Sequence, residues 1–135
     1  TKMHFEPNTN GSEAGISFFQ KDDNYINFTL RKDEGNHYLQ AYIVKNGELL
    51  ATIKEHLVQY EGNIKLKVIA NKDAYKLYYS ISGRTHFNIF ATLDGSSLKS
   101  NGYTGAHLGL YATSNGKETK DSASFEYVNY LIKKK

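Results

Sequence analysis

Cysteine and tryptophan are absent from this sequence of 135 residues, and it contains a single proline. Without cysteine the chain has no disulfide framework and no thiol chemistry, so its composition leaves the redox compartment open. No apolar run reaches the length of a membrane span, and no charged, apolar leader opens the chain, so we expect no membrane partner. Helix start and stop signals are nearly absent too. Tyrosine and phenylalanine are plentiful instead, with 11 and 7 residues, and these aromatic side chains suit the half-buried surface of a β-sheet.

The distribution of charge along the sequence bears on whether the protein binds nucleic acid. The formal net charge is +3, and lysine and arginine are scattered apart from the run at 133–135. A short terminal run is typical of a solvated tail, whereas a nucleic-acid-binding surface needs a clustered basic patch. We therefore expect no nucleic-acid partner. The length suits one domain with a real core and is too short for two, so residues 1–135 are expected to form a single domain.

Turn residues recur at intervals of about ten residues, which is the spacing of a β-sandwich or barrel. Asn46 and Gly47 are the strongest hairpin signal and favour a type I′ turn. About ten short strands without crossover helices predict an all-β, antiparallel two-sheet β-sandwich. The expected strands are 3–5, 14–20, 25–31, 37–44, 49–54, 64–70, 75–81, 87–93, 107–113 and 125–132, with Phe87, Ile89, Ala91 and Leu93 as one inward-facing row.

Two of these strands carry side chains suited to sugar binding on their polar sides. If the strands pair, they form one patch, because alternate residues of a strand share a face. Aromatic rings stack on the apolar side of a sugar ring, while amides, hydroxyls and arginine bind its hydroxyls. The alternative is that the tyrosines only cover neighbouring strands. The residues are Tyr25, Asn27 and Arg31 on the first strand and Tyr38, Gln40 and Tyr42 on the second.

The sequence lacks the patterns expected of an enzyme. A glycosidase needs two carboxyl groups that face one cleft, and the sequence shows no closely spaced pair on one strand. Glu126 stands alone on a strand, whereas predicted turns hold Asp22, Asp23, Asp33, Glu34 and Asp121. There is no Gly-x-Ser-x-Gly motif, and the five histidines lack zinc-binding spacing. We expect no catalytic residues, no cofactor and no metal site that the sequence can locate. A structural calcium ion with oxygen ligands is left open.

A glycine-rich segment near the C-terminal end indicates a family. Three glycines between Gly102 and Gly109 predict a shaped loop with Tyr103 at its tip, followed at once by a strand. Residues Tyr103 to Ala112, read with Ala123 to Tyr130, resemble the C-terminal β-sandwich domain of family 43 glycoside hydrolases, the β-xylosidase and α-L-arabinofuranosidase type. In that family an aromatic residue precedes Thr-Gly-Ala, and an apolar pair and Gly-Leu-Tyr-Ala follow.

Further elements extend this resemblance over nearly the whole chain. Phe5 to Pro7 resembles the family's Phe-x-Pro element, and Glu13 to Ile16 resembles its Ala-Gly element. The second C-terminal motif is looser, because Ser124, Glu126 and Val128 stand where the family carries Asp, Asp and Phe. The order and spacing of the elements together carry the resemblance.

The resemblance implies a concanavalin A-like jelly roll that packs against the catalytic five-bladed propeller of a parent enzyme. The residue that matches the family's loop aromatic is Tyr103, which would reach the mouth of the propeller's active site. Gly102, Thr104 and Gly105 would shape its loop. His107 follows directly and is placed to face whatever Tyr103 meets. The catalytic acids belong to the propeller, so this chain alone is expected not to be an enzyme.

We therefore expect an accessory, carbohydrate-binding domain of a bacterial glycoside hydrolase, acting on xylan or arabinoxylan chains of the plant cell wall. Its candidate sugar-binding residues are Tyr103, His107, Tyr25, Arg31, Gln40 and Tyr42. The chain begins almost at the Phe-x-Pro element, so we expect a segment of a larger protein that lacks some N-terminal strands of the family module. The alternatives are a free-standing lectin-like domain, a purely structural docking domain, and an enzyme of the same fold whose carboxylate pair the sequence does not show. The sequence leaves open whether the protein is secreted, periplasmic or cytoplasmic.

Overall fold

The computed structural model describes residues 1–21, 24–58, 60–70, 74–81, 86–94, 107–116 and 121–127. These residues form ten strands and no helix. None of the described segments is a helix long and apolar enough to cross a membrane. The strands are β1 (Lys2–Phe5), β2 (Glu13–Lys21), β3 (Asn24–Asp33), β4 (Asn36–Lys45), β5 (Glu48–His56), β6 (Asn63–Ala70), β7 (Ala74–Ile81), β8 (Asn88–Asp94), β9 (His107–Thr113) and β10 (Ala123–Tyr127).

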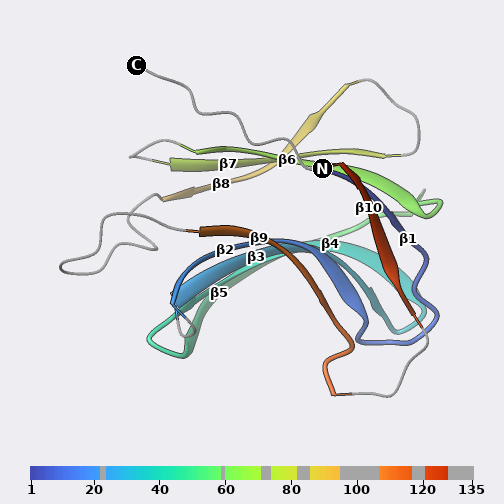
Figure 1. The fold of residues 1–135 in the computed structure, drawn as a ribbon, viewed down its shortest axis with the longest axis horizontal. Helices are drawn as coiled ribbons and strands as arrows, with labels where there is room; N and C mark the ends of the chain where they lie inside the picture. The colour runs from blue at the N-terminus through green and yellow to red at the C-terminus, as the bar shows by residue number, and fades with distance from the viewer. Residues whose placement is uncertain are drawn as a thin grey trace.

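The strands form two five-stranded sheets that face each other (Figure 1). One sheet has the order β10-β1-β6-β7-β8 and the other the order β5-β4-β3-β2-β9. Neighbouring strands in both sheets run antiparallel. The second sheet arches in Figure 1 with its convex side toward the first. The predicted antiparallel β-sandwich of concanavalin A-like type is confirmed.

Two tight turns connect three neighbouring strands of the second sheet. Asn46 and Gly47 have φ angles of 54° and 77°, and Lys45 pairs directly with Glu48. Positive φ at both central residues defines the type I′ hairpin that the sequence predicts. Glu34 and Gly35, with φ angles of 50° and 80°, connect β3 to β4 in the same way. These turns place the alternating residues of β3, β4 and β5 beside one another.

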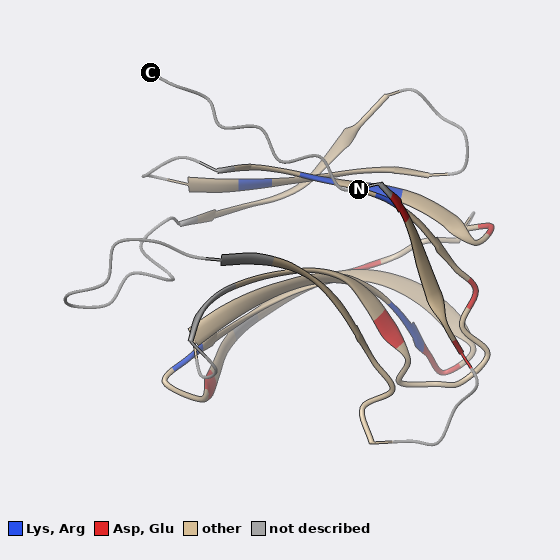
Figure 2. Cartoon of the chain, viewed as in Figure 1, with Lys and Arg blue, Asp and Glu red and all other residues tan. Residues whose placement is uncertain are grey.

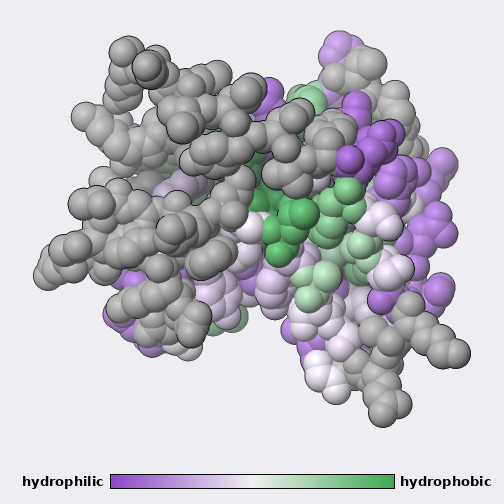
Figure 3. Space-filling view, in the orientation of Figure 1, coloured by the Kyte–Doolittle hydropathy of each residue, from purple (hydrophilic) through white to green (hydrophobic). Residues whose placement is uncertain are grey.

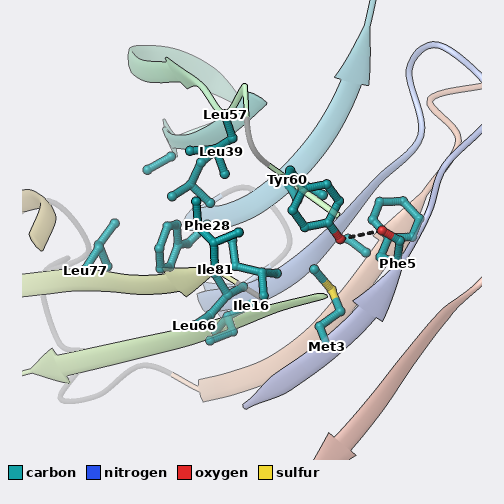
Figure 4. Close-up of a cluster of buried hydrophobic side chains, with 14 of the residues drawn as sticks. Met3, Phe5, Ile16, Phe28, Leu39, Leu57, Tyr60, Leu66, Leu77 and Ile81 are labelled. Atoms are coloured by element: carbon teal, nitrogen blue, oxygen red, sulfur yellow. Dashed lines mark hydrogen bonds between the residues drawn. The ribbon is translucent and has the colours of Figure 1, made fainter. Parts of the chain in front are cut away.

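The core lies between the sheets and is made of alternate residues of nearly every strand. Ile26, Phe28 and Leu30 of β3 are completely buried. Figure 4 shows side chains of both sheets pointing toward one another, among them Phe28, Leu66 and Leu77. The ring of Phe18 on β2 also stacks on Tyr75 of β7, with centroids 5.7 Å apart. These contacts bury apolar surface from both sheets, which is the main stabilising term of such a fold.

The inward-facing row predicted for residues 87–93 is partly wrong. Phe87 and Ile89 are 38% and 58% exposed, so neither belongs to the core. The pairing shifts between Leu77↔Ala91 and Tyr78↔Ile89, which leaves Phe90 as an extra residue. Such a bulge reverses the facing of the residues on one side of it. Phe90 consequently takes the inner position and stacks on Phe28, with ring centroids 5.6 Å apart.

The two sheets leave one edge of the core partly open to solvent. Strand β9 is the edge of one sheet and β10 the edge of the other, and both lie toward the viewer in Figure 1. The inward side of β9 includes Leu110, which is 44% exposed, and Ala112, which is also exposed. On β10, Ala123 and Phe125 pack against the core but are only partly buried. Figure 3 shows apolar residues reaching the surface at the centre of this side of the molecule. We call Leu110, Ala112, Ala123 and Phe125 the open edge.

Candidate functional site

The side of the sheet β5-β4-β3-β2-β9 that faces away from the core is polar. Because Ile26, Phe28 and Leu30 point into the core, the alternate residues of β3 point outward. Cross-strand pairing extends this side over all five strands. We call it the polar face, and its described side chains include Glu13, Tyr25, Asn27, Thr29, Arg31, Asp33, Tyr38, Gln40, Tyr42, Lys54, His56 and Tyr111.

The structure brings four of the candidate sugar-binding residues together on the polar face. The register pairs Asn27 with Tyr42, Thr29 with Gln40, and Arg31 with Tyr38. The ring of Tyr25 meets that of Tyr42 edge to face, with centroids 6.4 Å apart. The amide Nδ2 of Asn27 donates a hydrogen bond of 2.8 Å to the Tyr42 hydroxyl. Tyr25, Arg31, Gln40 and Tyr42 therefore share the surface that the alternation pattern predicts.

The remaining candidates fall partly or wholly outside the described residues. Tyr103 and the three loop residues Gly102, Thr104 and Gly105 all lie outside them. The backbone of His107 begins β9 and pairs with that of Phe19. The side chain of His107 is not described. The relation between the Tyr103 loop and the polar face therefore stays a prediction.

The sequence analysis did not identify Glu13, whose carboxylate accepts hydrogen bonds from several side chains of the polar face. Its side chain is 1% exposed. Thr29 Oγ1 donates to Glu13 Oε2 at 2.6 Å, and Gln40 Nε2 donates to the same oxygen at 3.2 Å. Asn115 Nδ2 donates to Oε1 at 3.0 Å, and the Tyr42 hydroxyl lies 3.4 Å from that oxygen. Alternation along residues 13–20 predicts that the side chain of Glu13 lies on the other face of the strand from Ala14. It does not predict the hydrogen-bond partners of Glu13, which come from three distant segments of the chain.

Phenol groups near Glu13 stay protonated at neutral pH. Burial is the main cause that raises the pKa of Tyr42, and the negative charge of Glu13 adds to the effect. The pKa of Tyr111 is raised for the same two reasons. Burial disfavours the charged phenolate, and so does a nearby carboxylate. Both tyrosines are therefore neutral donors on the polar face.

The charges of the polar face are paired. Arg31 Nη1 lies 3.7 Å from Glu13 Oε1, and Lys54 Nζ lies 3.4 Å from Asp33 Oδ2. The Lys54 ammonium also lies 4.1 Å from the centre of the Tyr38 ring. Figure 2 shows acidic and basic residues on the sheet that carries the polar face. The described part of the polar face thus carries charges of both signs.

Two buried polar atoms of this face have no hydrogen-bond partner among the described residues. They are Oδ1 of Asn27 and Nε of Arg31. A buried polar group without a partner costs roughly 1–3 kcal/mol. One acceptor and one donor on the polar face are therefore not satisfied by the chain's own described groups.

Polar contacts hold the start of β2 in place. Asp121 accepts hydrogen bonds from the backbone amides of Asn8 and Thr9, at 2.8 and 2.9 Å, and from the Ser12 hydroxyl at 2.9 Å. Asn115 also donates to the carbonyl oxygen of Gly11 at 2.6 Å. The segment before Glu13 is therefore fixed to the two ends of the connection between β9 and β10.

The described residues hold no group that matches a metal centre. No set of three or more His, Asp or Glu side chains among them is arranged to bind a metal ion. Glu13 is the only buried acidic side chain in the part of the chain that the structure describes. Its hydrogen bonds engage both carboxylate oxygens.

The two antiparallel sheets around one core define a concanavalin A-like β-sandwich domain. Residues 1–131 match the family described as the β-xylosidase C-terminal concanavalin A-like domain, and the chain belongs to this family. It is similar to the non-reducing end α-L-arabinofuranosidase BoGH43B of Bacteroides ovatus, with 23% identity over 141 residues. That match covers 96% of this chain and 24% of the relative.

Two solved structures share the fold. The Bacteroides ovatus xyloglucan PUL GH43B matches with a TM-score of 0.78 and 21% identity. The family 43 protein BlXynB of Bacillus licheniformis matches with a TM-score of 0.74 and 28% identity. Each match covers 90% of this chain and 24% of the other chain. This chain therefore spans about a quarter of the length of these relatives, which are family 43 glycoside hydrolases by name.

Proposed function

We propose that this chain is a non-catalytic accessory domain of a family 43 glycoside hydrolase and that its polar face binds xylan- or arabinoxylan-type oligosaccharides. The observation that carries the proposal is the placement of Tyr25, Arg31, Gln40 and Tyr42 on one outward surface of a sheet. Side chains on strands are held more precisely than side chains on loops, which favours a preorganised site. Aromatic rings beside amide and guanidinium donors are the chemistry that sugars require.

The hydrogen bonds within the polar face indicate which of its groups are left to contact a sugar. The Tyr42 hydroxyl is engaged by Asn27 and lies beside Glu13, so the ring of Tyr42 is the part left for a ligand. Arg31 keeps 28% of its side chain exposed and can donate to sugar hydroxyls. Tyr25, half-buried beside Tyr42, extends the aromatic surface. In this proposal the rings stack on the sugar and Arg31 orients it.

The catalytic partner in this proposal is the five-bladed propeller of a parent enzyme. The family's name places this domain at the C-terminal end of β-xylosidases. Tyr103, shaped by Gly102, Thr104 and Gly105, would then reach the mouth of the propeller's active site, with His107 beside it. The chain itself shows no second buried carboxyl group near Glu13 among its described residues, so the pair that glycoside hydrolysis needs would come from the propeller.

The open edge favours docking as a second role. Leu110 is 44% exposed although it lies on the inward side of β9, and Phe125 beyond it is only partly buried. An apolar surface of this kind is typical of a protein contact. Docking of the catalytic domain there would cover the core where the two sheets leave it open. A purely structural domain would use this surface and bind no sugar.

Calorimetric titration with xylo-oligosaccharides and arabino-oligosaccharides tests the proposal. We expect saturable binding that the pair of substitutions Tyr25→Ala and Tyr42→Ala abolishes, while Tyr78→Ala on the other sheet leaves it unchanged. Circular dichroism of each variant checks that the fold is intact. Absence of heat with every sugar would overturn the sugar-binding role and leave docking, with Tyr103 at the interface, as the function to pursue.

A further inference from the structure

The polar face carries charges of both signs in two matched pairs. Its described acidic and basic side chains are Glu13, Arg31, Asp33 and Lys54. Arg31 pairs with Glu13, and Lys54 pairs with Asp33. His56, opposite Tyr38, is the remaining described imidazole of the face. With histidine neutral, the described part of the polar face has no net charge.

The pair formed by Glu13 and Arg31 differs from an ordinary surface ion pair. Glu13 is 1% exposed, whereas the Arg31 side chain is 28% exposed. Three neutral donors, from Thr29, Gln40 and Asn115, hold the carboxylate in place. The negative charge therefore cannot turn away from Arg31, and charges in a partly buried site are screened less by salt than exposed ones.

We infer that Glu13 makes the polar face selective for uncharged sugar chains over chains that carry a carboxylate. The inference rests on the proposed sugar binding and adds the class of ligand. A uronic-acid carboxylate that approached the exposed part of Arg31 would also approach the fixed carboxylate of Glu13. A neutral hydroxyl meets no such repulsion and can accept a hydrogen bond from the guanidinium. Selectivity of this kind comes from a repulsive element as well as an attractive one.

The test compares a neutral linear xylo-oligosaccharide with the same chain carrying one uronic-acid branch. Binding is measured by calorimetry at low ionic strength for the wild-type chain and for Glu13→Gln, which removes the charge and keeps the size of the side chain. We expect the wild type to prefer the neutral chain. In the variant, the affinity for the acidic chain relative to the neutral chain should rise by a factor of about three to five, the range expected of one partly exposed ion pair. Added salt should reduce this gain.

Two further variants make the result specific. Asp33→Asn removes the exposed carboxylate that pairs with Lys54 and should shift the preference less than Glu13→Gln does, because exposed charges are screened more strongly than buried ones. If Glu13→Gln does not fold, the preference of the wild type between the two chains decides the question. Glu126→Gln changes the net charge of the chain by the same amount but lies on β10 of the other sheet, where Glu126 pairs with Lys2. It should leave the preference unchanged. Thermal unfolding of each variant checks that the fold is intact.

The outcomes separate this inference from the proposed function. Equal affinity of the wild type for the two chains, or an unchanged preference in folded Glu13→Gln, would overturn the inference and leave sugar binding standing. The same shift in Glu126→Gln would overturn it too, because the effect would then follow the total charge. If the wild type binds neither chain, the proposed sugar binding itself is overturned, and the selectivity falls with it.

Discussion

The hydroxyl of Thr29 donates a hydrogen bond of 2.6 Å to the carboxylate of Glu13 across the pair β2 and β3. Both side chains are buried, although they lie on the outward side of the sheet. A buried carboxylate is tolerated only when hydrogen bonds or an opposite charge compensate for its lost hydration. This contact is the centre of the network that orders the polar face.

Glu13→Ala should lower the free energy of unfolding by about 2–4 kcal/mol. The change leaves the donors of Thr29, Gln40 and Asn115 without their shared acceptor. Thr29→Val removes only one of these donors and should cost about 1–2 kcal/mol. Urea denaturation measures both. An equal loss of stability in the two variants would show that Glu13 does not stabilise several donors at once.

Gly15→Ala should destabilise the fold by about 3 kcal/mol or more, because its methyl group has no room. A Cβ atom at this position would collide with the backbone carbonyl oxygen of Phe28 and lie 2.7 Å from the Cα atom of Thr29. Gly47→Ala is the control, since it meets nothing within 4 Å and carries only the strain of a φ angle of 77°. That variant should lose about 1 kcal/mol. A tolerated Gly15→Ala would contradict the close approach of β2 and β3.

Tyr60→Phe should cost about 1–2 kcal/mol, because the buried Tyr60 hydroxyl donates to the carbonyl oxygen of Phe5 (Figure 4). Burial also raises the pKa of Tyr60, so the donor keeps its proton at neutral pH. Tyr78→Phe is the matched control and should change stability by about 0.5 kcal/mol or less, as surface substitutions do. Thermal unfolding of the two variants checks the difference. A cost no larger than that of the control would mean that the Phe5 carbonyl is satisfied in another way.

The stability contribution of Glu126 should disappear in acid. Hydrogen bonds from His4 and Lys2 lower the pKa of Glu126 below its ordinary value of 4.5. A carboxyl group whose pKa is lower in the folded state adds stability above its unfolded pKa and loses it as the pH falls through its folded pKa. The difference in melting temperature between wild type and Glu126→Gln should therefore be largest at neutral pH, decline as the pH falls below 4.5, and vanish once the pH is below the lowered pKa of the folded state. A difference that is constant with pH would exclude this contribution.

The sequence specified much of the fold because its signals are local. Alternation of Ile26, Phe28 and Leu30 with Tyr25 and Arg31 sets which side of β3 is polar. The Asn46 and Gly47 turn joins β4 to β5, although their register shifts between Ile43 and Val44. Period-two patterns and turn residues act over a few residues, so the polar face with Tyr25, Arg31, Gln40 and Tyr42 could be predicted.

Only the tertiary structure decided which distant groups meet. Asn115 reaches Glu13 from the far end of the chain, and a bulge places Phe90 rather than Ile89 against Phe28. A bulge leaves the alternation of apolar residues unchanged in the sequence, and a hydrogen bond across 102 residues has no local pattern. By itself the sequence determined strands, turns and the polarity of their faces, because each depends on neighbouring residues. The hydrogen bonds around Glu13 depend on pairing between strands that are far apart in the chain. This pairing is complete only when the whole sandwich has formed.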